Sequence, residues 1–312
     1  MSELDRHLQS LGVFNFAGTD VERARVVMFG APMDWTVSFK PGTRFGPGRI
    51  REASYGLEEY SPVYDRHLSE VRVADIGDLV LPFGNVEQSL AIIYEQAKRI
   101  VEQGKIPFVL GGEHLITLPV VTAVAERYPD LVLVHFDAHT DLRDTFFGES
   151  RSHATVIRRC AERLGAGRIY QYGIRSGERH EFQYAETMTV MRRYGVTELT
   201  RDMARFADRP VYITFDIDVI DPAFCPGTGT PEPDGITVRD AFDALRSLAG
   251  LNVVGMDVVE VSPPYDPSGT TAITAAKIVR EALVAYWWEG PGPARAREDA
   301  LAGRDRANVI RS

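Results

Sequence analysis

The stretch Leu131–Asp141, with the sequence LVLVHFDAHTD, joins an apolar run to a cluster of acidic and imidazole side chains. We predict a strand over Leu131–Asp137. From Leu131 to Phe136 every residue except His135 is apolar, so this strand has no face suited to water. Strands that are apolar on both faces are typical of a parallel sheet covered by helices on both sides. The stretch therefore predicts an α/β fold in which polar residues follow the end of a buried strand.

Similar short apolar runs alternate with amphipathic helical patterns through most of the chain. The further strands that this pattern predicts are Arg25–Gly30, Val71–Asp75, Pro107–Gly111, Ile169–Gly173, Met188–Met191, Val211–Asp216 and Val253–Val259. Strands and helices in alternation predict right-handed crossovers within one wound parallel sheet. No change of composition marks a domain boundary, and we expect a single domain over residues 1–288.

Two of the predicted helices carry end signals. Val86–Gln103 has apolar residues at helical spacing, and Asn85 and Gly104 are residue types that cap the start and the end of a helix. Ala241–Leu248 follows Thr237, a residue type favoured at the N-cap. These signals predict where the two helices begin and end.

The composition is that of a globular protein, with 312 residues, 44% hydrophobic residues, 25% charged residues and a net charge of −9. The acidic balance argues against a nucleic-acid partner, because neutralising phosphates needs a basic face. Two cysteines exclude a disulfide framework, and no apolar run approaches the roughly 18–20 residues that span a bilayer. We expect a cytoplasmic protein without membrane contact.

Residues 289–312 lose the apolar periodicity and are predicted to form a tail, partly disordered or packed on a neighbouring subunit.

Clusters of polar residues follow three of the predicted strands. They have the sequences GGEH at residues 111–114, DAHTD at 137–141 and DID at 216–218. The carboxyl ends of parallel strands meet at one edge of a sheet, and carboxylates gathered there repel one another unless a cation lies between them. The candidate metal ligands are His114, Asp137, His139, Asp141, Asp216 and Asp218. Two imidazoles and four carboxylates are too many for one zinc and suit two bridged octahedral ions, and such oxygen-rich ligands favour manganese over zinc.

Each cluster also has a simpler interpretation. Asp216 and Asp218 could belong to a turn, the DAHTD segment could cap a strand end, and His114 alone could be a structural histidine. Their joint occurrence on three strand ends favours the metal centre. His135 lies deeper in its strand and is interpreted as a core residue or a partner of a ligand.

Longer motifs around these clusters resemble the arginase/agmatinase (ureohydrolase) family. They are SFKPGTRFGPGRIR, GGEH, FDAHTD, SHAT, TFDIDVIDPAFCPGTGTPEPDG and GMDVVEVSPPYD. The resemblance runs from about Val26 to Tyr286, and DAHTDLR, SHAT and YGIRSGERHEF are most similar to bacterial agmatinases. It implies a three-layer αβα sandwich with a central, mostly parallel sheet of about eight strands, and a homotrimer or homohexamer. Glu113, where many relatives have Asp, and Ala154, where other branches have Gly, depart from the family pattern.

The resemblance also implies which residues hold each of two Mn²⁺ ions. One ion is expected to be held by His114, Asp137, Asp141 and Asp216. The other is expected to be held by His139, Asp137, Asp216 and Asp218. On this assignment Asp137 and Asp216 bridge the two ions.

The same resemblance implies hydrolysis of a guanidinium group to urea and an amine. Two neighbouring cations lower the pKa of a shared water from ~15.7 toward ~7, so a bridging hydroxide is the expected nucleophile. The resemblance assigns Glu260 to hold the guanidinium, His153 to protonate the leaving amine and Asp141 to orient the hydroxide. Without the family, Glu260 would be interpreted as a surface carboxylate at a strand end.

The loop of residues 143–152, RDTFFGESRS, bears on the choice of substrate. It lacks the Asn of the arginase pattern, and Phe146 and Phe147 either form an apolar wall for a methylene chain or simply pack. A guanidine without a carboxylate fits best, so we expect agmatine to be converted to putrescine and urea. Guanidinobutyrate, guanidinopropionate, arginine and formimidoylglutamate remain alternatives. Arg143 or Arg151 could receive a carboxylate, which keeps guanidinobutyrate open.

Three other classes of protein fit less well. A binuclear metallophosphoesterase would carry its motifs in a different order from GGEH followed by DAH, and a zinc deacetylase would need fewer carboxylates and a catalytic tyrosine. A relative that binds without turnover would be expected to lose ligands, and here the ligand set is complete.

Overall fold

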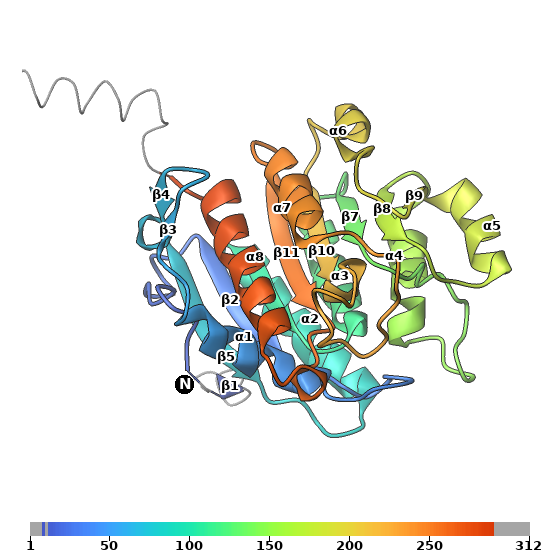
Figure 1. Cartoon of the computed structure of the whole chain (residues 1–312), viewed down its shortest axis with the longest axis horizontal. Coiled ribbons are helices and arrows are strands. Elements are labelled where there is room, and N and C mark those ends of the chain that lie inside the picture. Colours follow the sequence, from blue (N-terminus) through green and yellow to red (C-terminus); the bar gives the residue numbers. More distant parts are fainter. Residues whose placement is uncertain (1–7, 10–11, 290–312) are drawn as a thin grey trace, which may run out of the picture.

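A computed structural model describes residues 8–9 and 12–289 of the chain. Its centre is one large sheet in the order β1-β5-β2-β6-β11-β10-β7-β8-β9 (Figure 1). The parallel strands are β2 (Val26–Ala31), β5 (Val73–Leu79), β6 (Ile106–Gly111), β7 (Val132–Phe136), β8 (Ile169–Ile174), β9 (Val190–Arg193), β10 (Val211–Asp216) and β11 (Val253–Val259). A short antiparallel strand, β1 (Leu8–Gln9), extends the β5 edge, and β3 (Tyr60–Ser61) pairs with β4 (Arg66–His67) apart from this sheet. The predicted α/β class and a sheet of about eight strands are confirmed.

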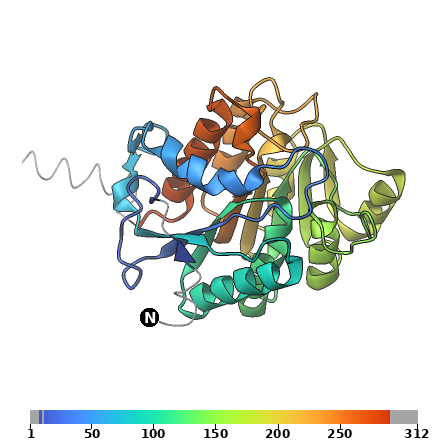
Figure 2. The same ribbon diagram turned by 90° about the horizontal axis from the view of Figure 1, so that it is seen from below.

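Helices cover both faces of the sheet. The helices are α1 (Gly46–Ser54), α2 (Val86–Glu102), α3 (Thr117–Arg127), α4 (Val156–Leu164), α5 (Arg179–Met188), α6 (Leu199–Asp202), α7 (Val238–Ser247) and α8 (Thr270–Tyr286). One buried cluster joins α1, α7 and α8 to one face, and a second joins α2, α3 and α4 to the other. Figure 2 shows these two groups on opposite sides of the sheet, which confirms the three-layer arrangement.

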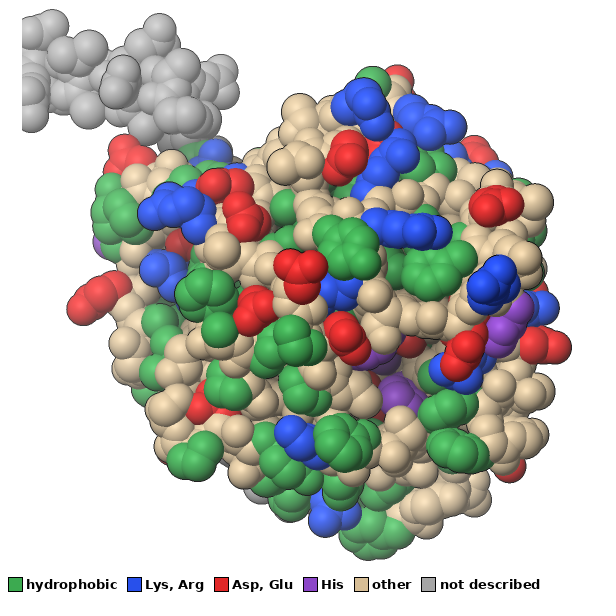
Figure 3. Space-filling view, turned by 45° about the vertical axis from the view of Figure 1, so that its right-hand side comes forward, with side chains coloured by type: hydrophobic (Ala, Val, Ile, Leu, Met, Phe, Trp, Pro, Cys, Tyr) green, Lys and Arg blue, Asp and Glu red, His purple; other side chains and the backbone are tan. Residues whose placement is uncertain are grey.

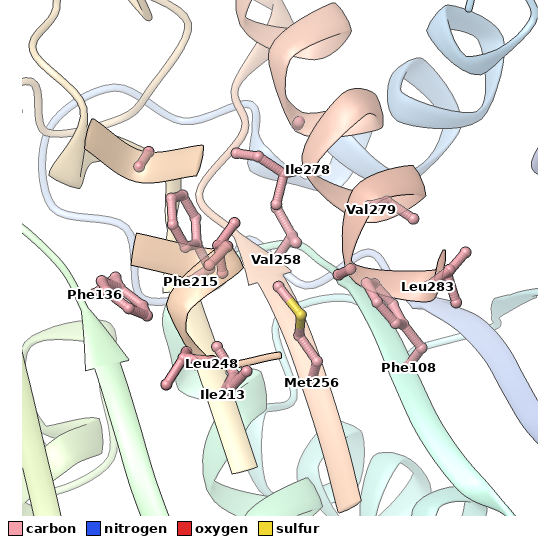
Figure 4. Packing of buried hydrophobic residues seen from close by; sticks show 14 of the residues in the cluster. Phe108, Phe136, Ile213, Phe215, Leu248, Met256, Val258, Ile278, Val279 and Leu283 are labelled. Atoms are coloured by element: carbon pink, nitrogen blue, oxygen red, sulfur yellow. The ribbon is translucent and has the colours of Figure 1, made fainter. Parts of the chain in front are cut away.

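The layer formed by α8 illustrates how the core is filled. Figure 4 shows Ile278, Val279 and Leu283 of α8 lying over Met256 and Val258 of β11. All five side chains are fully buried. A parallel strand packed this way on both faces must be apolar at successive positions, which is the pattern that identified these strands in the sequence.

The predicted helix ends are largely confirmed. The Asn85 side chain accepts a hydrogen bond from the backbone N–H of Gln88, and Gly104 follows α2 with φ of 71°. The Thr237 side chain accepts from Asp240 N, so α7 begins at Val238 rather than at Ala241. The first turn of α7 contains the polar residues Arg239 and Asp240. The apolar periodicity begins only after them, so the predicted start was three residues too late.

The strand predicted at Val71–Asp75 is the one with the largest shift, since β5 spans Val73–Leu79. Asp75 and Asp78 interrupt its apolar pattern because both pair with Arg51 of α1, whose side chain is buried. In the sequence, the charged residues of a buried ion pair resemble residues of an exposed loop. The predicted strand therefore ended at Asp75, before the end of β5.

Two further expectations concern the ends of the chain and the membrane. The predicted tail from residue 289 lies outside the described residues, apart from Glu289 itself. Within the described part of the chain, no helix has both the length and the apolar character needed to cross a bilayer.

Candidate metal centre and adjoining cavity

Four neighbouring strands in the middle of the sheet, β6, β11, β10 and β7, end at the candidate site. His114 follows β6, Asp137 follows β7, Asp216 ends β10, and Glu260 follows β11. The side chains predicted as metal ligands are thus brought together from three separate segments of the chain, which contain His114, residues 137–141 and residues 216–218. Figure 3 shows histidine side chains in a hollow of this face, with acidic side chains around it.

The turn between β6 and His114 needs glycine for a steric reason. A Cβ atom at Gly112 would lie 2.2 Å from the backbone oxygen of Met33. Gly112 N donates to Ala31 O at 3.1 Å, and Gly112 O accepts from Glu260 N at 2.9 Å. The GGEH motif therefore ties the His114 turn to the two strands beside it.

The His114 imidazole faces three carboxylates. Its Nδ1 atom lies 3.1 Å from Asp137 Oδ2, 3.3 Å from Asp141 Oδ2 and 3.1 Å from Asp216 Oδ2. This nitrogen is buried and has no hydrogen-bond partner among the described residues. A neutral imidazole with its lone pair aimed at three carboxylates is unfavourable unless a cation lies between them.

The opposite edge of the ring fixes which nitrogen carries the proton. Thr214 Oγ1 donates to Asp257 Oδ1 at 2.6 Å and lies 2.9 Å from His114 Nε2, so it accepts the Nε2 proton. Asp257 also accepts from Thr117 and from the Tyr212 hydroxyl. With Nε2–H held in this way, Nδ1 of neutral His114 is left free as a metal ligand.

A second imidazole, His139, faces the other side of the carboxylate cluster. His139 Nδ1 lies 3.1 Å from Asp218 Oδ2 and 3.4 Å from Asp137 Oδ1. Asp137 therefore presents Oδ2 to His114 and Oδ1 to His139, as a carboxylate that bridges two ions would. Two overlapping groups of ligand atoms result, each with atoms within 4.8 Å of one another: His114, His135, Asp137 and Asp141, and Asp137, His139 and Asp218.

The charges at this cluster also fit divalent cations. Among the described residues, histidines are the only basic side chains within ion-pair distance of Asp137, Asp141, Asp216 and Asp218. Burial and then the charge of Asp218 raise the pKa of Asp216 well above its usual range. Burial and the charge of Asp137 raise the pKa of Asp141 to about 7. Bound cations would remove this repulsion, so these residues fit a binuclear metal centre.

The positive φ of Asp141 and Glu260, 51° and 62°, distinguishes the site from the strands below it. Non-glycine residues in this region of conformational space are strained, and such strain gathers at functional sites. Glu260 directly follows β11 and Asp141 lies in the loop after β7, and the carboxylates of both approach His114.

Glu260 is buried, with 3% of its surface exposed, which disagrees with the alternative of a surface carboxylate. Its Oε1 accepts from His114 N at 2.7 Å. Among the described residues no hydrogen bond ends on Oε2. Burial raises the pKa of Glu260 well above its usual range, and a guanidinium bound beside it would favour the charged form.

His153 lies at the start of a short 3₁₀ turn above the metal cluster. Its backbone N–H donates to Thr36 Oγ1 at 3.0 Å, and its Nε2 lies 3.1 Å from Ser38 Oγ. Burial, followed by the nearby His139 and His114, lowers the pKa of His153 to about 4. The imidazole is therefore neutral at neutral pH. Its pKa lies below the near-neutral value expected of a general acid that is protonated at rest.

A cavity of about 230 Å³ opens beside His139, Asp141 and His153. Its remaining lining residues are Ser38, Thr140, Arg143, Phe146, Ala154, Ser176, Gly177, Glu178, Glu181 and Thr230. Arg143 Nη2 lies 3.5 Å from Glu178 Oε1, and Arg143 Nε lies 3.7 Å from Glu181 Oε2. The positive charge of Arg143 is therefore compensated within the cavity wall. The lining as a whole carries more carboxylates than cations.

The predicted substrate loop is only partly at this cavity. Phe146 lines it, with its ring edge-on to His153 at 5.9 Å between centroids, while the Phe147 side chain is 87% exposed. Arg151 pairs with Glu87 at the surface and lines a different groove. Of the two arginines considered for a substrate carboxylate, Arg143 alone lines the cavity.

Several residues at the site were missed by reasoning from the sequence. Ser38, Glu178, Glu181 and Thr230 line the cavity from loops or a helix start, and Gln171 hydrogen-bonds to His135 from the neighbouring strand. Ser38 and Glu178 lie inside motifs that were recognised, SFKPG and RSGERHEF, but nothing in a single polar residue indicates which way it points. Only Glu178 and Glu181 carry a signal in the sequence, because acidic residues three positions apart are typical of the start of a helix, here α5.

Comparison with known proteins agrees with the geometry. The model of the Arginase family matches residues 24–285. The chain is 49% identical to the agmatinase of Bacillus subtilis (strain 168) over 278 residues, covering 88% of this chain and 96% of that protein. It is 38% identical to a guanidinobutyrase of Pseudomonas aeruginosa over 271 residues, covering 81% of this chain and 84% of that protein. The crystal structure of a putative agmatinase from Clostridium difficile is similar with a TM-score of 0.83 and 40% identity, covering 85% of this chain and 99% of that one.

Proposed function

We propose that this chain, which belongs to the Arginase family, hydrolyses the guanidinium group of agmatine to putrescine and urea at a centre of two divalent cations. The observation that carries the proposal is the buried Nδ1 of His114, unpartnered and surrounded by three carboxylates. A buried imidazole nitrogen that faces three carboxylates requires a positive charge between them, which either a proton or a bound metal cation can supply.

The proposed ligands are the six residues predicted from the sequence. The first ion would be held by His114, Asp137, Asp141 and Asp216. The second would be held by His139, Asp137, Asp216 and Asp218. Four carboxylates and only two imidazoles favour Mn²⁺ over Zn²⁺.

The bound cations would supply a water of lowered pKa as the nucleophile. Asp141, whose Oδ2 lies 3.3 Å from His114 Nδ1, is placed to orient that water. Glu260 Oε1 is held by His114 N, which leaves Oε2 to accept from a guanidinium N–H and fix the plane of the substrate.

His153 would carry the proton that the leaving amine requires. Because its pKa is lowered to about 4, the imidazole is neutral at rest. It could accept the proton that remains on the attacking oxygen and then donate that proton to the leaving amine nitrogen as the C–N bond breaks. Ser38 Oγ, 3.1 Å from Nε2, is placed to orient the ring toward the cavity. Both steps then use one side chain, and the amine departs protonated.

The cavity supports an amine-bearing substrate. Glu178 and Glu181 flank Arg143, so a second cationic group on the substrate would meet carboxylates, whereas a substrate carboxylate would have to compete with them for Arg143. Phe146 offers a face for the methylene chain between the two ends. Guanidinobutyrate is the second candidate, because Arg143 does line the cavity and one relative is a guanidinobutyrase.

The proposal extends to the setting of the enzyme. It is a cytoplasmic enzyme of putrescine biosynthesis with one catalytic domain over residues 1–288, and it assembles as a homotrimer or homohexamer. The two cysteines, Cys160 and Cys225, are free and buried, in keeping with a reducing compartment.

Urea release from the manganese-loaded protein tests the proposal. Agmatine, arginine, 4-guanidinobutyrate and 3-guanidinopropionate are compared at equal concentration, with formamide release from formimidoylglutamate as a separate assay. We expect the highest kcat/KM for agmatine. If guanidinobutyrate is the better substrate, the substrate assignment is wrong and the reaction class stands. If protein that binds two Mn²⁺ releases neither urea from any of the guanidines nor formamide from formimidoylglutamate, the chain is a non-catalytic relative.

A further inference from the structure

His135 is a buried imidazole that the proposed mechanism does not use. It lies in β7 two residues before Asp137, with none of its surface exposed. Its Nε2 is 2.7 Å from Asp137 Oδ2, the same oxygen that lies 3.1 Å from His114 Nδ1. The carboxylate proposed to bridge the two cations therefore has a fixed partner outside the ligand set.

The other nitrogen of His135 reveals which way this hydrogen bond runs. Gln171 is paired with His135 across the neighbouring strand β8. The Nε2 atom of Gln171 lies 3.1 Å from Nδ1 of His135. The same amide nitrogen donates to Thr140 O at 2.9 Å, while Oε1 accepts from the Thr189 hydroxyl at 2.9 Å. These two contacts fix the orientation of the amide, since a nitrogen must face the carbonyl and an oxygen must face the hydroxyl donor.

An amide nitrogen can only donate, so Nδ1 of His135 must accept. Its proton is therefore on Nε2, and the ring donates to Asp137 Oδ2. The lone pair needed to ligate a cation points away from the cluster, toward Gln171. This argues against His135 as a ligand, although its ring lies among the potential ligand atoms.

Asp137 is consequently asymmetric. Its Oδ2 accepts from a side chain, and its Oδ1 accepts from the backbone N–H of His139 at 2.5 Å. Each oxygen is thus held in place on one side and faces one imidazole of the centre on the other. Hydrogen bonds of this kind orient a ligating carboxylate and set how strongly each oxygen donates to its ion.

We propose that His135 is a positioning residue for the binuclear centre, locked by Gln171 as an Nε2–H donor that holds Asp137 in its bridging orientation. This inference rests on the proposed metal centre and goes beyond the ligand set. It assigns to Gln171 of β8, which does not itself line the cavity, a part in setting the affinity for the ions and the coupling between them.

The test uses His135→Phe, which removes the donor, and Gln171→Leu, which removes the lock while keeping His135. Tyr172→Phe is the matched control, because it deletes one buried hydrogen bond on the same strand, from the Tyr172 hydroxyl to Asp202. Mn²⁺ binding is measured by titration with detection of free Mn²⁺ by electron paramagnetic resonance, and the spectrum of the loaded protein reports the coupling between the two ions.

We expect both variants to bind two Mn²⁺, with affinity reduced about tenfold in His135→Phe and less in Gln171→Leu, and with a changed coupling pattern. His135→Gln, whose amide nitrogen reaches a similar position, should recover most of the affinity. The control should match the original protein in both measurements. Gln171→Leu keeps the inference testable if His135→Phe does not fold.

Original affinity and an unchanged spectrum in both His135→Phe and Gln171→Leu would overturn the proposal. Loss of one whole ion in His135→Phe would also overturn it, because His135 would then be a ligand. Failure of the substrate assignment is separate, since it is judged by urea release from agmatine in the original protein and leaves these metal measurements unaffected.

Discussion

At the scale of single residues, the site depends on which atom of each polar side chain is free. His114 and His139 each turn one ring nitrogen toward carboxylates, while His135 turns a proton toward one of them. Residue type alone does not distinguish these cases. The difference lies in the partner on the far side of each ring, such as Thr214 behind His114 and Gln171 behind His135.

His153→Asn tests the proposed proton carrier. The variant should keep its Mn²⁺ content, because the imidazole lies outside the ligand set, and kcat on agmatine should fall by about 10²–10⁴, the usual contribution of general acid–base catalysis. Steady-state kinetics and metal analysis on the same preparation check this. A kcat close to that of the original protein would remove His153 from proton transfer.

Glu260→Gln tests the guanidinium contact. The Gln side chain can still accept from His114 N, so the metal centre should persist, but the charge that faces the substrate is lost. A charge-assisted hydrogen bond contributes about 1.5–3 kcal/mol, so kcat/KM for agmatine should fall about 10–100-fold. Kinetics with agmatine measure the effect, and an unaltered kcat/KM with full metal content would contradict the role.

The affinity for Mn²⁺ should rise with pH. Burial opposes protonation of His114, but Asp137, Asp141 and Asp216 outweigh it and hold its pKa well above the usual range. The pKa of Asp141 is about 7. Below these pKa values the ligands hold protons that a cation must displace, and raising the pH removes them. Titrations at about pH 6 and about pH 8 should therefore give tighter binding at the higher pH, and equal affinities would contradict this.

At the scale of elements, the strands form the sheet, and the polar residues that follow their ends form the site. The strands were predictable because burial on both faces demands apolar residues, and the ligand clusters were predictable because carboxylates are out of place at the end of such a strand. The positive φ of Asp141 and Glu260 was not predictable, since their backbones are held by other segments of the chain. Asp141 O accepts from Ile157 N and Arg158 N of α4, and Glu260 N donates to Gly112 O. The partners Glu178, Glu181 and Gln171 were missed for the same reason.

Helix α1 provides a stability test remote from the site. Arg51→Ala leaves Asp75 and Asp78 buried without their partner, and breaking such a pair costs about 3–5 kcal/mol. Arg49→Ala, on the same helix, removes an exposed pair with Glu52 and should cost at most about 1 kcal/mol. Denaturant unfolding of both variants measures the difference. Equal losses of unfolding free energy would show that the buried pair contributes no more than the exposed one.

At the scale of the whole molecule, the carboxylate cluster opposes folding until it is neutralised. Binding to the native state alone stabilises it by RT ln(1 + [L]/Kd), about 2.7 kcal/mol per site at one hundred times Kd. Removing Mn²⁺ with a chelator should therefore lower the Tm by about 5 °C or more. Calorimetry of Asp218→Asn serves as the control, because a variant with a damaged site should respond less. An equal shift in both proteins would mean that the chelator acts elsewhere.

The order of the strands has a consequence for biosynthesis. β6 and β7 are consecutive in the chain, yet β10 and β11 lie between them in the sheet. A ribosome-bound nascent chain that has emerged only as far as β8 holds His114, Asp137, His139 and Asp141 but neither Asp216 nor Asp218, and the space between β6 and β7 is not filled. The complete set of proposed ligands can therefore assemble only after β10 and β11 have been translated, and the proposed cations would meet it in an almost finished polypeptide.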